Sequence, residues 1–179
     1  MIPGGPFDII VMDPPWRFSS NSADRPGRNA RRHYRCMRDD EIAALPVPQI
    51  VGRDALLFLW VTVPILERAM RIPPAWGFRY VSQLVWVKDR PATGFWSRNR
   101  HEPVLIYRRG KFPCPSPAPF TDSVFFAKKR QHSRKPEILQ DRIDAVWPQA
   151  RKLEMFARRP RAGWETWGND PERFEAVGA

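Results

Sequence analysis

A carboxylate, two prolines and a tryptophan follow a short apolar segment near the start of the chain. Residues 7–12 (Phe-Asp-Ile-Ile-Val-Met) have the character of a buried strand, and Asp13-Pro14-Pro15-Trp16 comes directly after them. Because proline has no N–H, neither proline can extend a hydrogen-bonded ladder, so the strand must end in a rigid turn. In open α/β sheets, sites form outside the carboxyl ends of strands. We therefore expect chemistry at this turn.

The side chains of this turn suit hydrogen bonding to an amine on a flat ring, such as N6 of adenine. The lone pair of that amine is delocalised into the ring, so the amine attacks an electrophile only when acceptors hold its N–H bonds and localise the pair. Asp13 can accept one such bond and the carbonyl of Pro14 can accept another, while Trp16 offers a face on which a flipped-out base can stack. The simpler alternative is an aspartate that only caps the turn.

The composition describes a single basic domain. The chain has 179 residues, which suits one domain with a full core, and its formal net charge is +11. Such a charge is typical of nucleic-acid binders, although a generally basic surface would give the same value. No apolar run reaches about 18 residues and no leader is recognisable, so we expect a soluble, non-secreted, cytoplasmic protein without a membrane segment. Cys36 and Cys114 lack metal-ligand spacing and fit free thiols in a reducing compartment.

The remaining sequence supplies elements that would hold this turn in place. Apolar runs predict buried strands, and prolines and 3.6-residue spacing predict where helices begin and end. The predicted strands are 55–62, 80–88, 103–107, 123–128 and an alternating edge strand at 151–160, and the predicted helices are 40–45, one from Pro64 toward Pro73, and one from Pro136 to Trp147.

Three segments without hydrophobic periodicity separate these elements. We expect residues 17–37 and 89–101 to be mobile loops that contact the substrate, because loops beside a site often have that role. A solvated insertion is the alternative for the first of them. Residues 112–120 carry proline at alternate positions and predict an extended connector.

The motif Asp13-Pro14-Pro15-Trp16 resembles the catalytic motif of the adenine-N6 methyltransferases, the family of the catalytic subunit of the mRNA adenosine methyltransferase complex. The similarity recurs in the same order at five places between Phe7 and Asp170. It implies an α/β fold: a single Rossmann-like, S-adenosylmethionine-dependent methyltransferase domain over residues 1–179, with a mostly parallel sheet and helices on both faces. It also implies that the four motif residues are catalytic and that no metal takes part. A small chain more resembles stand-alone bacterial or phage members, which favours DNA over RNA as the substrate.

The resemblance assigns a second group of residues to the nucleic-acid substrate. Arginines interleaved with aromatic residues in the 89–101 loop suit backbone neutralisation and base stacking. The alternative for Glu102 is a surface acid paired to Arg100 or Arg108. The substrate residues implied are Trp16, Tyr34, Trp86, Lys88, Trp96, Arg98 and Glu102.

A third group is assigned to the cofactor, S-adenosylmethionine. Lys135 lies at the start of a predicted helix, where N–H groups and cations converge on an anion, and the resemblance assigns it to the methionine carboxylate. A phosphate-neutralising lysine is the alternative there, and ordinary edge-strand charges are the alternative for the residues after Leu153. The cofactor residues implied are Asp13, Lys135, Glu154, Phe156, Arg158, Asn169 and Asp170.

Two departures from the family pattern keep another function open. Arg158-Arg159-Pro160-Arg161-Ala162 stands where the family commonly carries His-Asn after an Arg-Pro. Family members also usually have a further upstream strand that supplies an acid to the cofactor's adenine, whereas this sequence starts only twelve residues before Asp13. The alternative is a catalytically silent, nucleic-acid-binding subunit that supports a partner methyltransferase. A homodimer or a partner subunit is compatible with either function.

Overall fold

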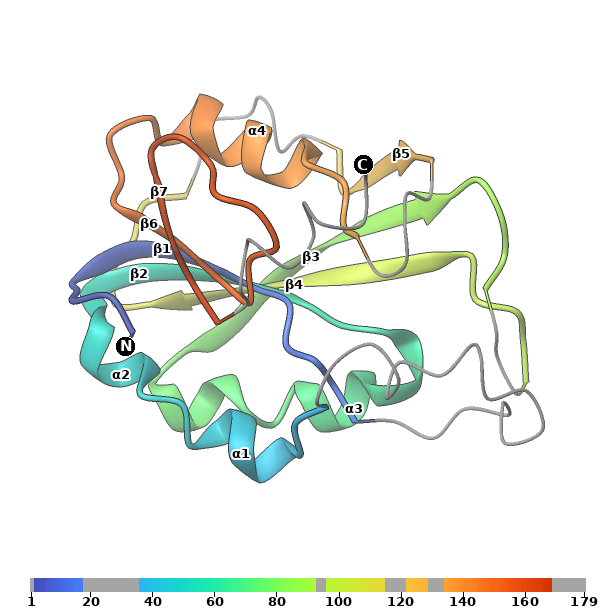
Figure 1. The fold of residues 1–179 in the computed structure, drawn as a ribbon, viewed down its shortest axis with the longest axis horizontal. Coiled ribbons are helices and arrows are strands. Elements are labelled where there is room, and N and C mark those ends of the chain that lie inside the picture. The colour runs from blue at the N-terminus through green and yellow to red at the C-terminus, as the bar shows by residue number, and fades with distance from the viewer. Residues whose placement is uncertain (1, 18–35, 93–95, 115–121, 129–133, 169–179) are drawn as a thin grey trace, which may run out of the picture.

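Seven strands form a single mixed sheet in the computed structural model, which describes residues 2–17, 36–92, 96–114, 122–128 and 134–168. Their order across the sheet is β5-β3-β4-β2-β1-β6-β7 (Figure 1). Every neighbouring pair is parallel except the two that include β4. The predicted mostly parallel sheet is therefore confirmed. The strands are β1 (Phe7–Met12), β2 (Val51–Trp60), β3 (Arg79–Lys88), β4 (His101–Arg109), β5 (Val124–Ala127), β6 (Lys152–Met155) and β7 (Trp164–Trp167).

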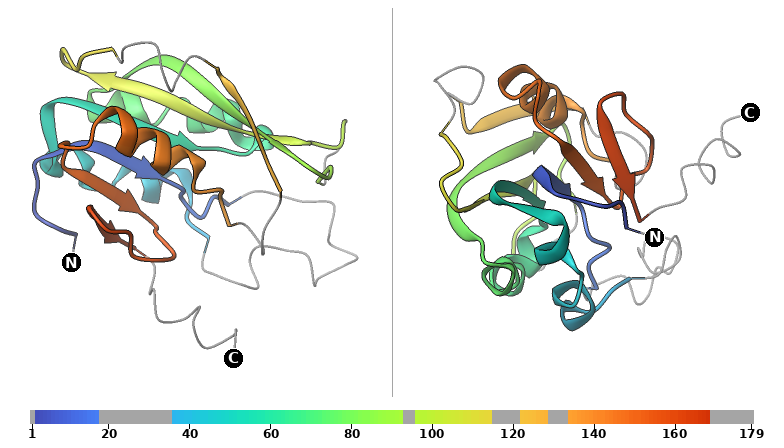
Figure 2. Two further views of the ribbon diagram at one scale, coloured as in Figure 1. Left: turned by 90° about the horizontal axis from the view of Figure 1, so that it is seen from above. Right: turned by 90° about the vertical axis from the view of Figure 1, so that its left-hand side faces the viewer.

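Helices cover both faces of this sheet, as predicted (Figure 2). One face carries a string of short helices, whose apolar side chains share a core with Ile10 and Met12 of β1. The other face carries α4, whose Leu139 and Ile143 share a core with Ile9 of β1. Because successive residues from Ile9 to Met12 enter opposite cores, that part of β1 is continuously apolar. The helices are α1 (Asp39–Ala43), α2 (Val47–Ile50), the 3-10 helix η4 (Val63–Ile65), α3 (Leu66–Ala69), the 3-10 helix η5 (Pro73–Trp76) and α4 (Ile138–Val146).

Prolines shape the short helices differently from the prediction. The segment from Pro64 was predicted to be one helix, but it consists of η4, α3 and η5 in succession. A second difference is α2, which begins directly after Pro46 and accommodates Pro48 in its first turn, where no intrahelical N–H bond is required.

The last predicted strand is wrong in length and in position. The prediction covered 151–160 as an edge strand, whereas β6 ends at Met155 and pairs with β1 on one side and β7 on the other. Phe156 has a positive φ of 64°, a conformation that ends the strand. The edge strand on this side of the sheet is β7, which the sequence pattern did not indicate.

Parts of the predicted loops lie outside the described residues: 18–35 of the first loop, 93–95 of the second, and 115–120 of the proline-rich connector. Their mobility and roles stay predictions. Among the residues that are described, none belongs to a helix with the length and apolar character that crossing a membrane requires.

Candidate functional site

Polar side chains from separate strands meet at one edge of the sheet. Asp13 follows β1, Trp60 ends β2, and Lys88 ends β3. Because β4 is antiparallel to its neighbours, its beginning lies at this same edge, and Glu102 joins the group there. The topology thus brings together residues that are up to 89 positions apart, as the numbering from Asp13 to Glu102 shows.

The turn after β1 is fixed by its own backbone and by the core. The N–H of Trp16 donates to the carbonyl of Pro14 at 2.8 Å, and the N–H of Met37 donates to the carbonyl of Pro15 at 2.8 Å. The Trp16 side chain is 5% exposed, and its Nε1 donates to the carbonyl of Trp60 at 3.1 Å. The structure therefore uses this indole to anchor the turn in the core. Its stacking on a substrate base stays a prediction.

Four charged side chains of alternating sign lie in a row behind the turn. Lys135 Nζ is 2.8 Å from Asp13 Oδ2 and 3.4 Å from Glu102 Oε2, and Lys88 forms an ion pair with the other oxygen of Glu102. Lys88 and Glu102 are 6% and 13% exposed in their side chains. The alternative partners for Glu102, Arg100 and Arg108, make no ion pair with it. The row carries two positive and two negative charges, so it is neutral as a whole.

The pKa values in this row follow from burial and from the neighbouring charges. Burial raises the pKa of Asp13, and the Lys135 ammonium beside it offsets only part of that rise. Burial also opposes ionisation of Glu102, but Lys135 and Lys88 together hold its pKa below the usual value. For Lys135, burial favours the neutral amine, but Asp13 and Glu102 outweigh it, and the pKa is raised. The ammonium form is therefore retained in the interior.

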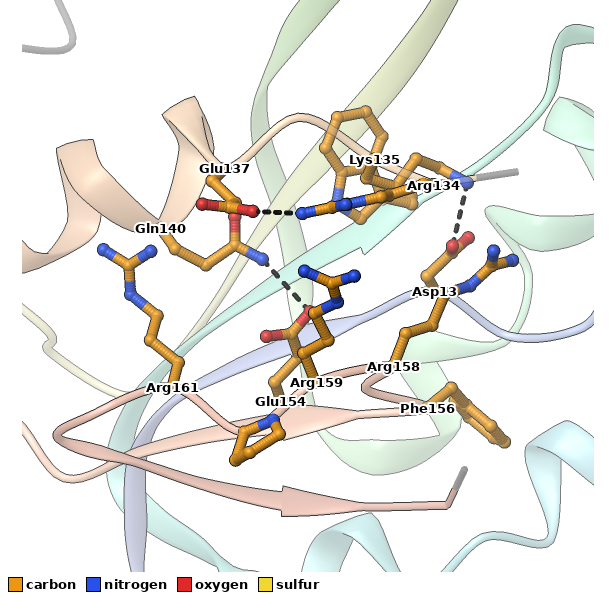
Figure 3. A pocket seen from close by; sticks show the side chains of 12 residues that line it. Asp13, Arg134, Lys135, Glu137, Gln140, Glu154, Phe156, Arg158, Arg159 and Arg161 are labelled. Atoms are coloured by element: carbon orange, nitrogen blue, oxygen red, sulfur yellow. Dashed lines mark hydrogen bonds and ion pairs between the residues drawn. The ribbon is translucent and has the colours of Figure 1, made fainter. Parts of the chain in front are cut away.

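A cavity of about 300 Å³ opens beside this row (Figure 3). Gln140 of α4 donates from Nε2 to Glu154 Oε1 of β6 at 3.1 Å, and Arg134 pairs with Glu137 at 2.7 Å. The Oε1 atom of Gln140 is buried and has no hydrogen-bond partner among the described residues. Burial raises the pKa of Glu154 to about 7, despite the hydrogen bond from Gln140. The residues that line the cavity are Asp13, Trp60, Arg134, Lys135, Glu137, Gln140, Glu154, Phe156, Arg158, Arg159, Pro160 and Arg161.

The cavity brings together all of the predicted cofactor residues that the structure describes. Asp13, Lys135, Glu154, Phe156 and Arg158 line it, whereas Asn169 and Asp170 lie outside the described residues. Phe156 reaches the cavity because the chain reverses there. A Cβ on Gly168, whose φ is +97°, would lie 3.3 Å from the Phe156 ring and backbone, so a glycine permits this close approach.

The predicted substrate residues are divided between the site edge and the surface. Trp86, Lys88 and Glu102 lie at the edge, but the Trp86 indole is buried and donates to the carbonyl of Ala127 at 2.9 Å. Trp96 and Arg98 are exposed on the segment between β3 and β4 and do not line the cavity. Tyr34 lies outside the described residues.

Sequence reasoning missed several residues of the cavity wall, and Gln140 is the most informative of them. It is buried beside Leu139 on the core side of α4, so a polar residue within an apolar helix stripe was the available signal. Arg161 also lines the cavity, but it pairs with Asp141 at 2.7 Å and Asp144 at 2.9 Å. Those partners come from α4, and nothing in the sequence indicated them.

Comparisons with known proteins agree on one family. The sequence model of the family described as MT-A70 matches residues 7–170. A Type II methyltransferase M.MunI from a Mycoplasma species is 30% identical over 183 residues, which cover 93% of this chain and 78% of the relative. An N(6)-adenosine-methyltransferase MT-A70-like protein of Arabidopsis thaliana is 33% identical, and the human N(6)-adenosine-methyltransferase catalytic subunit METTL3 is 28% identical. The chain spans 24% of the length of the former and 28% of the latter.

Proposed function

Because the chain belongs to the MT-A70 family, we propose that it transfers a methyl group from S-adenosylmethionine to the exocyclic N6 of adenine in nucleic acid. We favour DNA over RNA, because the relatives include a type II methyltransferase from a Mycoplasma species. Such a reaction would take place in the cytoplasm of a bacterial or phage-infected cell. The observation that carries the proposal is the position of Asp13, held by Lys135 at 2.8 Å, on the wall of a cavity that also contains Glu154.

Asp13 and Pro14 are suited to activate the amine. A carboxylate offers about four acceptor positions, so the bond from Lys135 leaves Asp13 able to accept from an N6–H bond. The carbonyl of Pro14 accepts from the backbone of Trp16 and retains a second lone pair. As the nitrogen would form its bond to the methyl carbon, the bond from that carbon to the sulfonium sulfur would break, the N6 hydrogens would become more acidic and both hydrogen bonds would strengthen. The methylated nitrogen would then lose one proton to water. Bonds that strengthen in the transition state are the ones that accelerate the reaction.

The cavity has acceptors and cations in places that fit the cofactor. S-adenosylmethionine supplies an electrophilic methyl carbon on a sulfonium. An ammonium has three N–H donors, and Lys135 donates one to Asp13 and lies 3.4 Å from Glu102 Oε2, so at least one donor remains for the methionine carboxylate. Glu154 and the unpartnered Oε1 of Gln140 offer acceptors for hydroxyl and amine donors. Phe156 and Arg158 complete this wall, and we assign Asn169 and Asp170 to the same ligand.

The substrate would approach from the exposed side of the sheet edge. Trp96 is fully exposed and Arg98 lies close by in sequence, a combination that suits base stacking together with backbone neutralisation. We propose that the loops 17–37 and 89–101, including Tyr34, grip the nucleic acid there. Lys88 and Glu102 would act from the buried side of the site, by keeping Lys135 and Asp13 in place through their ion pairs.

A silent subunit that supports a partner methyltransferase remains the second candidate. The observation in its favour is Arg161, which stands near the family's His-Asn position and is held by two aspartates of α4. An arginine engaged in this way is less available to a cofactor.

Cofactor titration followed by labelled methyl transfer tests the proposal. The wild-type protein should bind S-adenosylmethionine and methylate adenine in at least one of four oligonucleotides: single- or double-stranded DNA or RNA. Asp13→Ala should leave cofactor binding largely intact, because Lys135, Glu154, Phe156 and Arg158 remain on the cavity wall, and it should lose transfer by about 100-fold or more. Glu67→Gln, which alters an 82% exposed carboxylate on α3, is the matched control and should behave as wild type.

Each other outcome has a distinct meaning. Cofactor binding without transfer to any oligonucleotide would support the silent subunit. Retained turnover in Asp13→Ala would remove that carboxylate from the mechanism. No cofactor binding at all would refute the proposed reaction.

A further inference from the structure

A second hollow lies at the opposite end of the sheet from Asp13. It has a volume of about 820 Å³, and we call it the far-edge groove. In Figure 1 the end of β4 and the start of β3 lie together there, away from the arrowhead of β3. Its lining residues include Arg53, Asp54, Phe78, Arg79, Arg108 and Lys111.

The cations of the far-edge groove come from neighbouring strands. Arg79 of β3 and Arg108 of β4 are direct partners in the antiparallel ladder, and Arg53 lies near the start of β2, the other neighbour of β4. Like charges directly opposite one another destabilise a sheet. The arrangement therefore has a cost for the folded protein, which an anion bound between the guanidinium groups would relieve.

No carboxylate in the described part of the chain neutralises these cations. Asp54 lines the groove, but its Oδ1 accepts from the backbone N–H of Lys111 at 2.6 Å, and it forms no ion pair. The Nε atom of Arg108 is buried and has no hydrogen-bond partner among the described residues. A buried donor without an acceptor is unfavourable and uncommon. Three basic side chains at the other sheet edge differ in this respect, because Lys88, Lys135 and Arg134 each lie within 4.0 Å of a carboxylate.

A polyanion fits the far-edge groove better than a single small anion. Four cations from three strands and the following turn exceed the charge of one phosphate. Trp60 at the site edge lies seven positions after Arg53 along β2, which corresponds to about 23 Å at about 3.3 Å per residue. One strand of a duplex carries about seven phosphates over that distance.

We propose that the far-edge groove binds backbone phosphates of the same nucleic acid whose target adenine enters the site beside Asp13. The inference rests on the proposed function, because it takes nucleic acid to be the substrate. The groove has no part in the chemical step. It increases the affinity for long substrates and has no effect on short ones, because only a long substrate reaches it.

Two hairpin substrates of different length separate the groove from the site. Both present the same adenine at the centre of the stem. A stem of about 6 base pairs extends about 10 Å to either side and does not reach the groove, whereas one of about 24 base pairs does. The test variant is the double substitution Arg53→Gln and Arg79→Gln, and both side chains are exposed, so the fold should tolerate it. The matched control is Arg142→Gln together with Arg71→Gln, which removes the same charge elsewhere.

The far-edge groove predicts a specific pattern of affinities. The double variant should bind the long hairpin more weakly, and the slope of log K against log salt should fall by about 1.8 for two lost phosphate contacts. Between about 50 mM and about 200 mM salt, wild type should therefore lose about tenfold more affinity than the variant. Affinity for the short hairpin, cofactor binding and the circular dichroism spectrum should match wild type, and the control should keep the wild-type slope.

Other results would overturn the inference, and they are distinguishable from failure of the proposed function. An unchanged slope and affinity for the long hairpin in the double variant would show that the groove does not bind nucleic acid. Loss of binding to polyglutamate without loss of hairpin binding would assign the groove to an acidic protein partner instead. Hairpin binding without methylation would contradict the proposed reaction alone, and the variants would still decide the role of the groove. A wild-type protein that binds neither hairpin would overturn both proposals.

Discussion

Replacement of Glu154 with glutamine should stabilise the protein at alkaline pH and weaken its hold on the cofactor. Glu154 lies on the cavity wall with one hydrogen bond from Gln140, and burial raises its pKa to about 7. The protein thus keeps a carboxylate in surroundings that disfavour its charge. Glutamine has the same shape without the charge, and its amide N–H can donate to the unpartnered Oε1 of Gln140.

The size of the effect follows from proton linkage. In the unfolded chain the pKa of Glu154 takes its ordinary value of 4.5, whereas in the folded protein it is about 7. Between these pH values the folded state binds more protons than the unfolded state, so stability falls as the pH rises. The contribution of Glu154 is fully present below 4.5 and is lost as the pH passes about 7. At about 1.4 kcal/mol per pKa unit, the loss is about 3 kcal/mol.

Urea unfolding of wild type and Glu154→Gln, without cofactor, measures this loss. The free energy of unfolding should be similar in the two proteins near pH 4, and near pH 8 the variant should be more stable by about 3 kcal/mol. Other groups also titrate in this range, so the difference between the proteins is the relevant quantity. Glu67→Gln, on an exposed face, should show the same pH dependence as wild type. A pH-independent difference between wild type and Glu154→Gln would refute a raised pKa at this position.

The same variant should bind S-adenosylmethionine more weakly. A hydrogen bond to a charged acceptor contributes about 1.5 to 3 kcal/mol, so the dissociation constant should rise by about tenfold or more near pH 8. Wild-type affinity should increase as the pH rises through 7, as the carboxylate ionises, and the affinity of the variant should not. Equal affinities throughout this range would exclude Glu154 from the cofactor site.

Two further variants test the supports of the site. Lys88→Met removes one partner of a buried ion pair, so it should lower the free energy of unfolding, measured in urea, by about 3 to 5 kcal/mol. A loss below about 1 kcal/mol would show that Lys135 alone neutralises Glu102. Trp16→Phe leaves the buried carbonyl of Trp60 without its donor, so it should cost about 1 to 3 kcal/mol and lower methyl transfer more than cofactor binding. Unchanged stability and turnover in Trp16→Phe would contradict the anchoring role of the indole.

Local patterns in the sequence were sufficient for the elements whose causes are local. The buried run of β1 and the proline pair after it predicted both the strand and the turn, and the structure has both. The helix after Pro136 was predicted from its apolar spacing, and α4 occupies Ile138–Val146. The end of β6 could not be predicted in this way, because it depends on Phe156 packing against the backbone near Gly168. That contact joins positions twelve residues apart and exists only once both are folded.

The site shows the same division between local and long-range causes. The motif residues and Lys135 were identified because each belongs to a short pattern with a known chemistry. Glu102 was predicted at the substrate pocket, but its partners were not identified, since the only ones considered, for the alternative of a surface acid, were Arg100 and Arg108. The actual partners are Lys88 and Lys135, and Glu102 reaches them because β4 runs antiparallel to its neighbours. Strand direction is a property of the whole sheet, so no local pattern indicates it.

The charged residues beside the catalytic turn are different from those expected to bind a polyanion. Lys88 and Lys135 are neutralised by Asp13 and Glu102, so the row beside the turn adds no net charge to the formal +11 of the chain. The cations of the far-edge groove and the exposed arginines around Trp96, by contrast, contribute to that positive charge. Salt screens exposed charges strongly and buried pairs weakly. Rising salt should therefore raise KM for nucleic acid while leaving the rate of transfer from the bound complex nearly constant. A rate that falls with salt at saturating substrate would place exposed charges in the chemical step itself.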